Sequence, residues 1–244
     1  NVLLLRDRMQ RAAPPAAGQR IRVYLGIDIG SVSTNLAVLD DDGRLLHEIY
    51  LRTVGRPIEI VHQGLQEIAS HFGDRLDIAG VGTTGSGREL IGELVGADCV
   101  NDEISAHKTG AMFISTTMVG QPVDTIFEIG GQDSKFISVD HGVVVDFAMN
   151  EACAAGTGSF LEEQAELYDI DLQRFVAAAR AAEQPPDLGQ MCTVYVADAG
   201  AEALKDGFAL GDVLAGFQYS VVHNYLDRVM GQRTLAPRVF FQGK

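Results

Sequence analysis

Runs of apolar residues divide the beginning of the chain into short strands. Residues 23–30 (VYLGIDIG) are predicted as a buried strand ending in glycine, and residues 34–40 (TNLAVLD) as the next one. A polar turn, DDG at residues 41–43, precedes a third predicted strand over residues 44–53 (RLLHEIYLRT). The pattern therefore predicts a three-stranded unit with a hairpin turn.

The same pattern returns about one hundred residues later. Residues 124–131 (DTIFEIGG), 134–140 (SKFISVD) and 143–150 (VVVDFAMN) are predicted strands, with a turn at His141 and Gly142. In this register Asp28-Ile29-Gly30 falls on Glu128-Ile129-Gly130, and Asp40 falls on Asp140. The sequence thus predicts a duplicated unit, each copy of which opens with an acidic residue, isoleucine and glycine.

Apolar residues at helical spacing occupy the segments between and after the two copies. Residues 57–72, 158–168 and 215–230 are predicted helices. Residues 81–98 (VGTTGSGRELIGELVGAD) indicate a strand, a glycine-rich turn and the start of a helix; the turn either borders a site or simply connects two elements. The prediction is an α/β protein with a first lobe over residues 21–120 and a second over residues 121–244.

Residues 1–20 are predicted as a linker or the remnant of a preceding domain, because Pro14 and Pro15 oppose a helix there. The last residues (RVFFQGK) suggest a strand that enters a glycine turn and stops. We therefore expect the chain to be part of a longer protein, with the second lobe truncated at its C-terminal end.

Two glycine turns of this kind form a natural clamp for phosphate groups. Glycine lets backbone N–H groups approach phosphate oxygens closely, which applies to Gly30, Gly130 and Gly131. Asp28 is the candidate ligand for Mg²⁺, through water. The remaining candidates are hydroxyl donors from Ser31, Ser33 and Thr34, and residues that orient an attacking water or the metal, Gln132 and Asp133. Two ordinary hairpins are the competing interpretation, and the matching register of the copies favours a nucleotide clamp.

The sequence lacks two other nucleotide-binding patterns. It contains no GxxxxGK[ST] motif, and no GxGxxG follows a strand in a βαβ setting. The P-loop and dinucleotide-binding folds are therefore weaker alternatives.

Composition narrows the class of protein. Of the 244 residues 46% are hydrophobic, which is enough for a buried core, and the net charge is −14 with a pI near 4.7. This charge argues against an extended surface for nucleic acid or an anionic membrane. No apolar run approaches the roughly 18–20 residues of a membrane span. Three cysteines, an odd and sparse set, indicate a reducing, cytoplasmic compartment.

Two of the cysteines stand beside segments that could hold a metal–sulfur group. Cys153 precedes the small residues Gly156, Thr157 and Gly158, which let the backbone approach a bulky group. The N-terminus of the following helix favours a thiolate there. Cys192 lies 39 residues on, at the start of a strand-like run (QMCTVYVAD).

These two thiolates cannot complete a four-thiolate site, but two copies of the chain would. The spacing alone leaves two buried structural cysteines as the favoured interpretation, and Cys99 is expected to be structural.

At this point the sequence resembles a known family: the ATPase activators of 2-hydroxyacyl-CoA dehydratases, grouped with the benzoyl-CoA reductase ATPase subunits as BadF/BadG/BcrA/BcrD-type ATPases. The matching stretches run in family order from Tyr24 to Tyr195. They are GIDIGSVSTN, TTGSGRELI, DEISAHKTGA, EIGGQDSKFI, MNEACAAGTGSFLEEQA and CTVY. The phrasing looks most like the activase domains of large multidomain members.

The resemblance implies a fold similar to actin, sugar kinases and heat-shock chaperones, with two lobes around ATP. It implies a homodimer that shares one 4Fe–4S cluster, with Cys153 and Cys192 as ligands. ATP hydrolysis would then drive a low-potential electron to an iron–sulfur acyl-CoA dehydratase or aryl-CoA reductase. Ferredoxin or flavodoxin is the donor that the family suggests.

Two departures from the family pattern and two alternatives stay open. Glu128 stands where the shorter activators usually have Asp, and Ala197 and Ala199 make the run after Cys192 atypical. The alternatives are a small-molecule kinase on the same fold, with Asp133 or Asp28 as base, and a degenerate docking or dimerisation lobe. His107 and Lys108 are expected on a helix that lines the cleft, without a chemical role.

Overall fold

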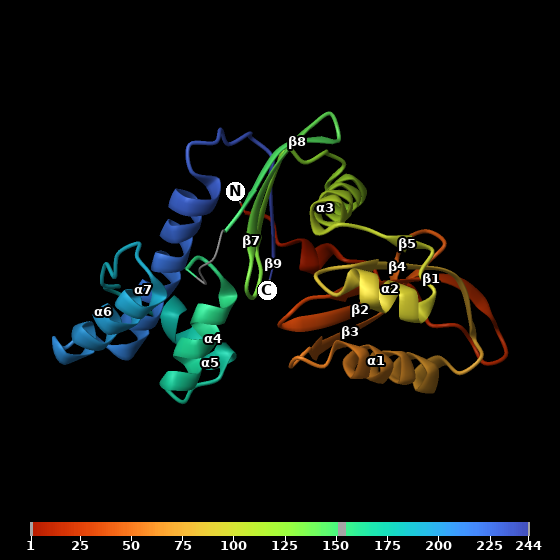
Figure 1. The fold of residues 1–244 in the computed structure, drawn as a ribbon, viewed down its shortest axis with the longest axis horizontal. Coiled ribbons are helices and arrows are strands. Elements are labelled where there is room, and N and C mark those ends of the chain that lie inside the picture. Colours follow the sequence, from red (N-terminus) through yellow and green to blue (C-terminus); the bar gives the residue numbers. More distant parts are fainter. Residues whose placement is uncertain (1, 151–154, 244) are drawn as a thin grey trace. The chain divides into compact units, whose positions relative to one another are not determined.

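A computed structural model of the protein describes residues 2–150 and 155–243. The chain divides between Gln121 and Pro122 into two compact units (Figure 1). Each unit contains one mixed β-sheet with helices. Within the described residues, no helix combines the length and apolar character needed to cross a membrane.

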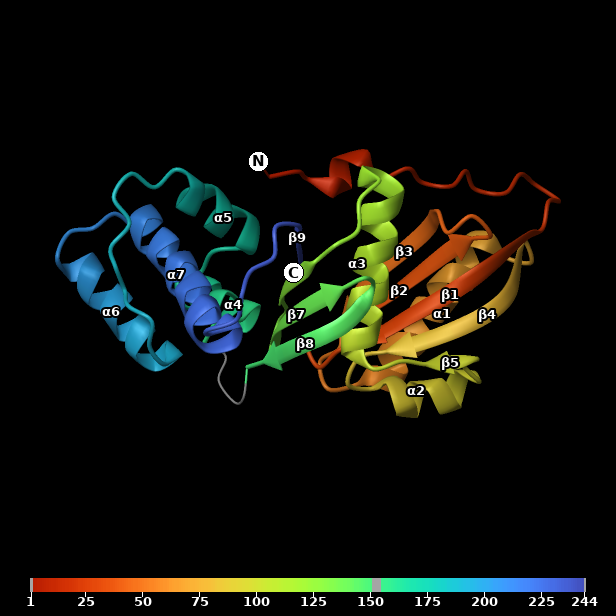
Figure 2. The same cartoon turned by 90° about the horizontal axis from the view of Figure 1, so that it is seen from above.

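The first unit is built on a five-stranded sheet in the order β3-β2-β1-β4-β5, whose strands lie side by side in Figure 2. The first three strands are antiparallel, and β4 and β5 run parallel to β1. The strands are β1 (Ile21–Ile29), β2 (Ser33–Asp40), β3 (Leu45–Arg52), β4 (Leu76–Thr84) and β5 (Cys99–Val100). The helical segments are η1 (Leu5–Arg8), α1 (Pro57–Phe72), α2 (Arg88–Val95) and α3 (Glu103–Val119).

The core of the first unit follows from the alternation seen in the sequence. Every second residue of β1 is buried, which places Val23, Leu25 and Ile27 on one face of the strand. Helix α1 begins at a favourable first-turn proline and buries Val61 on the same core. Ile91 of α2 joins this cluster, so both helices pack on one face of the sheet.

The second unit repeats the strand order of the first. Its sheet runs β8-β7-β6-β9, with β6, β7 and β8 antiparallel and β9 parallel to β6. Asp28 pairs with Asn35 across β1 and β2, and Glu128 pairs with Lys135 across β6 and β7. The duplication and its one-hundred-residue register are confirmed. The strands are β6 (Thr125–Ile129), β7 (Ser134–Asp140), β8 (Val143–Met149) and β9 (Val239–Gly243).

In the sequence of the second unit, a group of helices comes between β8 and β9. It contains α4 (Gly158–Leu167), α5 (Leu172–Arg180), α6 (Thr193–Lys205), α7 (Leu210–Asn224) and the π-helix η2 (Tyr225–Met230). Phe217 of α7 is fully buried in a core shared with Phe160 and Phe175. η2 packs on the sheet through Val229 and Phe136. The helices predicted over residues 158–168 and 215–230 are present, and the second begins earlier.

The strand-like run expected from Cys192 onward is wrong, because this segment is helix α6. Its buried residues Val196, Gly200 and Ala203 recur at helical spacing on one face. An added Cβ at Gly200 would collide with the ring of Phe217, so α6 approaches α7 closely there. Tertiary packing therefore overrides the local β preference of the sequence VYV.

Candidate functional site

The glycine turns of the two units have the same geometry. In the first, Gly30 N–H donates to Ser33 O at 2.9 Å; in the second, Gly130 N–H donates to Asp133 O at 2.9 Å. An added Cβ would lie 3.0 Å from Ser33 O at the first turn and 2.9 Å from Asp133 O at the second. Both turns therefore require glycine for a close approach of backbone to backbone.

Hydrogen bonds from threonine hydroxyls stabilise the first turn. Thr53 donates to Gly30 O at 2.8 Å, and the hydroxyls of Thr34 and Thr53 share a hydrogen bond of 3.0 Å. Thr34 is 0% exposed, so its hydroxyl belongs to the support of the turn. Ser31 is exposed and Ser33 is half-buried, which keeps them as candidate donors.

The glycine-rich loop after β4 lies directly against this turn. Gly87 N–H and the Ser86 hydroxyl donate to Ile29 O at 3.0 and 3.3 Å. Gly85 has a φ of +87°, and an added Cβ would lie 2.6 Å from an Asp28 carboxylate oxygen. The loop thus borders the candidate phosphate turn of the first unit.

Thr84, which pairs with Asp28 in register, supplies an unusual polar atom. Its Oγ1 is buried without a hydrogen-bond partner in the part of the chain that the structure describes. A buried orphan hydroxyl is costly unless a ligand or water completes it. It therefore fits a site that is filled when the protein works.

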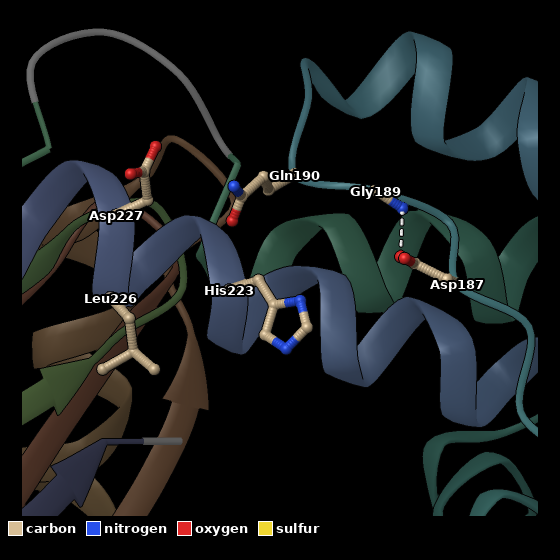
Figure 3. Close-up of a pocket in the computed structure, with 6 residues that line it drawn as sticks. All are labelled: Asp187, Gly189, Gln190, His223, Leu226 and Asp227. Atoms are coloured by element: carbon tan, nitrogen blue, oxygen red, sulfur yellow. Dashed lines mark hydrogen bonds between the residues drawn. The ribbon is translucent and has the colours of Figure 1, made fainter.

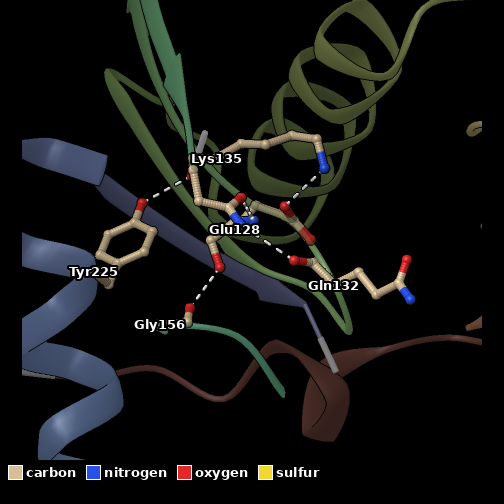
Figure 4. Close-up of polar contacts among 7 residues, drawn as sticks. Glu128, Gln132, Lys135, Gly156 and Tyr225 are labelled. Carbon is tan, nitrogen blue, oxygen red and sulfur yellow. Dashed lines mark hydrogen bonds and ion pairs between the residues drawn. The ribbon is translucent and has the colours of Figure 1, made fainter. Parts of the chain in front are cut away.

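The two equivalent acids have different partners. Asp28 Oδ2 accepts from the neutral amide of Asn35 at 3.3 Å. Glu128 Oε2 lies 3.2 Å from Lys135 Nζ, with side chains only 6% and 5% exposed (Figure 4). The Glu128 carboxylate is therefore charge-compensated by a lysine, and the Asp28 carboxylate accepts from an amide.

Backbone bonds join the second turn to the start of α4. Gly158 N–H donates to Gly130 O, and Ser159 N–H donates to Gly131 O, each at 2.8 Å. An added Cβ at Gly158 would lie 3.2 Å from Gly130 O. The small residues at this point thus bring a helix N-terminus onto the turn, and they fill two of its otherwise unsatisfied donors.

Asn150, the last residue before the segment 151–154, is hydrogen-bonded to the same turn. Its side-chain amide donates to Gln132 O at 3.2 Å, and its Oδ1 accepts from Ser134 N at 2.7 Å. The side chains of Gln132 and Asp133 are exposed. In Figure 4 the Gln132 side chain extends away from the Glu128–Lys135 pair.

Of the two cysteines expected to bind a cluster, the structure describes one. Cys153 lies outside the described residues. Cys192 is free and half-buried, and it is the N-cap residue of α6. Cys99 is free and exposed on β5. Among the described residues, no three His, Cys, Asp or Glu side chains group as metal ligands.

Thr157 and Gly156 complete the segment before α4. Thr157 is the fully buried N-cap residue of that helix. Gly156 O accepts from the Ser134 hydroxyl at 2.6 Å. His107 and Lys108 lie half-buried on α3, as the sequence predicted for a helix in that region.

Sequence reasoning missed one cavity and the polar contacts around it. A pocket of about 640 Å³ lies beside the segment that leads to Cys192 (Figure 3). Asp187 accepts from Gly189 N at 2.9 Å within its wall. The pocket has no local sequence signal, because its lining comes from two segments that are far apart in the chain: Asp187, Gly189, Gln190, His223, Leu226 and Asp227.

Known proteins resemble this chain over most of its length. The chain is 32% identical over 217 residues to the (R)-2-hydroxyglutaryl-CoA dehydratase activating ATPase of Acidaminococcus fermentans, covering 88% of this chain and 77% of that protein. The crystal structure of that dehydratase's component A matches with a TM-score of 0.79 at 26% identity, over 91% of this chain and 82% of the other. The Clostridium difficile 2-hydroxyisocaproyl-CoA dehydratase activator with bound ADPNP matches with a TM-score of 0.75 at 26% identity, over 91% and 80%.

These similarities settle the fold and the family. The two repeated sheets have the actin-like ATPase fold, as the sequence predicted. The BadF/BadG/BcrA/BcrD ATPase family model matches residues 25–244, which include both glycine turns and the segments of Cys153 and Cys192. The chain belongs to the BadF/BadG/BcrA/BcrD ATPase family.

Proposed function

We propose that this protein is an ATP-dependent activator that passes a low-potential electron to an iron–sulfur acyl-CoA dehydratase or aryl-CoA reductase. Relatives named as dehydratase activators, one of them with bound ADPNP, support the ATP and dehydratase parts. The observation that carries the proposal is the pair of 2.8 Å bonds from the start of α4 to Gly130 O and Gly131 O. They tie a candidate phosphate turn to the helix that follows Cys153.

The glycine turns are the proposed phosphate-binding elements of each unit. Backbone N–H groups around Gly30 and Gly130, with the Ser31 and Ser33 hydroxyls, would contact phosphate oxygens. Asp28 is the proposed Mg²⁺ residue, through water, because its carboxylate lies at the end of β1, between the first glycine turn and the glycine-rich loop at Gly85.

The exposed Gln132 and Asp133 would orient the attacking water. This assignment separates the two acids of the repeat: Asp28 serves the metal, and Glu128 serves the fold.

Cysteine thiolates are the proposed ligands of a 4Fe–4S cluster, which would supply one-electron transfer at low potential. Cys192 suits this role, because it is free, partly accessible and placed at a helix N-terminus, where an anionic group is stabilised. Cys153 would be the second ligand. Because one chain has two such thiols, the complete set requires a homodimer.

The chain's own contribution to coupling is mechanical. Gly158 and Ser159 are the first residues of α4, and both are bonded to the turn that would contact phosphate. A shift of the turn on hydrolysis would therefore move the start of α4. A reduced ferredoxin or flavodoxin is the proposed donor, and the free thiols are suited to the reducing cytoplasm.

Replacement of Asp28 tests the ATPase part. In the anaerobically prepared protein, we expect Asp28→Asn to lower ATP hydrolysis by about 100-fold, since charge stabilisation of this kind contributes two to three orders of magnitude. Asp41→Asn, in the β2–β3 turn, is the matched control and should hydrolyse ATP normally.

Unchanged hydrolysis in Asp28→Asn would contradict the assignment. Phosphoryl transfer to a hydroxyl compound that survives Cys192→Ala would favour a kinase. No hydrolysis with Asp28 and Asp133 intact would favour a docking lobe.

A further inference from the structure

The junction between α7 and η2 is unusual in both geometry and burial. The chain passes from an α-helix ending at Asn224 into a π-helix beginning at Tyr225. π-Helical turns are rare and frequently mark functional sites. Asn224 and Tyr225 are 2% and 1% exposed, although both carry polar groups. Each polar group reaches a different segment of the second unit.

Tyr225 contacts the strand that leaves the phosphate turn. Its hydroxyl donates to Lys135 O at 2.8 Å, as Figure 4 shows. Lys135 is two residues after Asp133 and forms the ion pair with Glu128. Burial, with the nearby charge of Glu128, raises the pKa of Tyr225, so the hydroxyl keeps its proton and remains a donor. A shift of β7 next to the turn would therefore change the hydrogen bond at Tyr225.

Asn224 contacts the segment that leads to Cys192. Its Nδ2 donates to Met191 O at 3.3 Å and to Ser220 O at 3.1 Å. Ser220, one turn earlier on α7, donates to Gly189 O at 2.6 Å. Two of the three residues before the N-cap of α6, Gly189 and Met191, are thus hydrogen-bonded to α7.

Asn224 is not placed for stability alone. Its Oδ1 is buried and has no hydrogen-bond partner among the residues that the structure describes. Such an atom costs free energy, and an apolar side chain of similar size would avoid the cost. What asparagine adds here is an amide that donates to Met191 O, outside its own helix, as well as to Ser220 O within it.

Gly156 brings the start of α4 to the same junction. An added Cβ at Gly156 would lie 3.2 Å from Tyr225 N, and its φ of +88° also requires glycine. Gly156 O accepts from Ser134, the residue immediately after Asp133. The junction therefore touches the phosphate turn's strand, the segment before α4 and the segment before α6.

Resting on the proposed function, we propose that Asn224 and Tyr225 are positioning residues that transmit the nucleotide state of the phosphate turn to the segment of Cys192. Adjacent residues of one helix move together, so a displacement of β7 at Lys135 changes the contact at Met191 O. The pocket lined by Gln190 and His223 leaves space beside this segment for such a shift.

Hydrogen exchange tests this inference with a readout that does not depend on bound iron. Amide exchange over residues 189–196 is measured in the iron-free and the loaded protein, with and without a saturating non-hydrolysable ATP analogue. In the wild type the analogue should change exchange in this segment. In Tyr225→Phe and in Asn224→Ala the change should be at least about threefold smaller, as expected for one lost hydrogen bond. Nucleotide affinity and iron content should stay at wild-type levels.

Tyr219→Phe is the matched control, because Tyr219 lies on the same helix but is 57% exposed. It should respond like the wild type. A full nucleotide response in both junction variants would overturn the inference, and so would a wild type that binds the analogue without any change over residues 189–196. Iron content reports separately on the proposed function, and a protein that binds no nucleotide would overturn both.

Discussion

Glu128 and Lys135 face each other across β6 and β7, with the carboxylate 3.2 Å from the ammonium, where the first copy of the repeat pairs Asp28 with Asn35. The two copies of the repeat thus carry different side-chain pairs at the same register position: an acid and an amide in the first, and an acid and an ammonium in the second. A buried ion pair lies at the second turn, and an acid beside an amide lies at the first. Asp28, whose carboxylate borders the loop at Gly85, is the acid that we propose for the metal.

Breaking the buried pair should destabilise the second unit strongly. Lys135→Met leaves the Glu128 carboxylate buried without its cation, which typically costs about 3–5 kcal/mol. The double variant Lys135→Met with Glu128→Leu should recover most of this loss, because no charge is then buried. Denaturant unfolding measures both.

Lys205→Met removes an exposed ammonium from Glu202 and should change stability little. Equal stability of Lys135→Met and the wild type would show that the pair contributes nothing.

Gly130 should be intolerant of a side chain for a local reason. An alanine Cβ there would lie 2.6 Å from a Glu128 carboxylate oxygen and 2.9 Å from Asp133 O. Overpacking of this kind costs about 1–3 kcal/mol. Because this strain distorts the turn, the Kd for ATP should rise about tenfold or more.

Gly110→Ala is the control, because its Cβ would meet nothing within 4 Å on helix α3. Nucleotide titration of the two variants should separate them. Identical ATP affinities would remove Gly130 from the site.

Asp124 should make the stability of β9 depend on pH. Its hydrogen bond from Arg238 holds the pKa of the carboxyl below its ordinary value of 3.8. The contribution is therefore present above pH 3.8 and is lost as the pH falls through the folded-state pKa.

The Tm of Asp124→Asn should be lower than that of the wild type near neutral pH. In acid the two Tm values should converge. A difference that stays constant down to pH 2 would contradict this cause.

Local patterns predicted the repeat because two features mark the register in each copy. One is the alternation of apolar and polar residues along the strands, and the other is the glycine required at the turn. The sequence did not predict that Cys192 precedes a helix, because β-branched residues at 194 and 196 mask the spacing that packs Gly200 on Phe217. The contacts of Tyr225 also lay beyond prediction. Its partner Lys135 is 90 residues away, and no local pattern encodes that pairing.

We propose that two cysteines from each of two chains hold the cluster. Iron and acid-labile sulfide are measured under strict anoxia in the wild type, Cys153→Ala, Cys192→Ala and the control Cys99→Ala. We expect about two iron and two sulfide per chain in the wild type, the content of one cluster shared by two chains. Cys99→Ala should keep them, and the other two variants should lose them. No iron in the wild type, or iron retained in Cys192→Ala, would contradict the account.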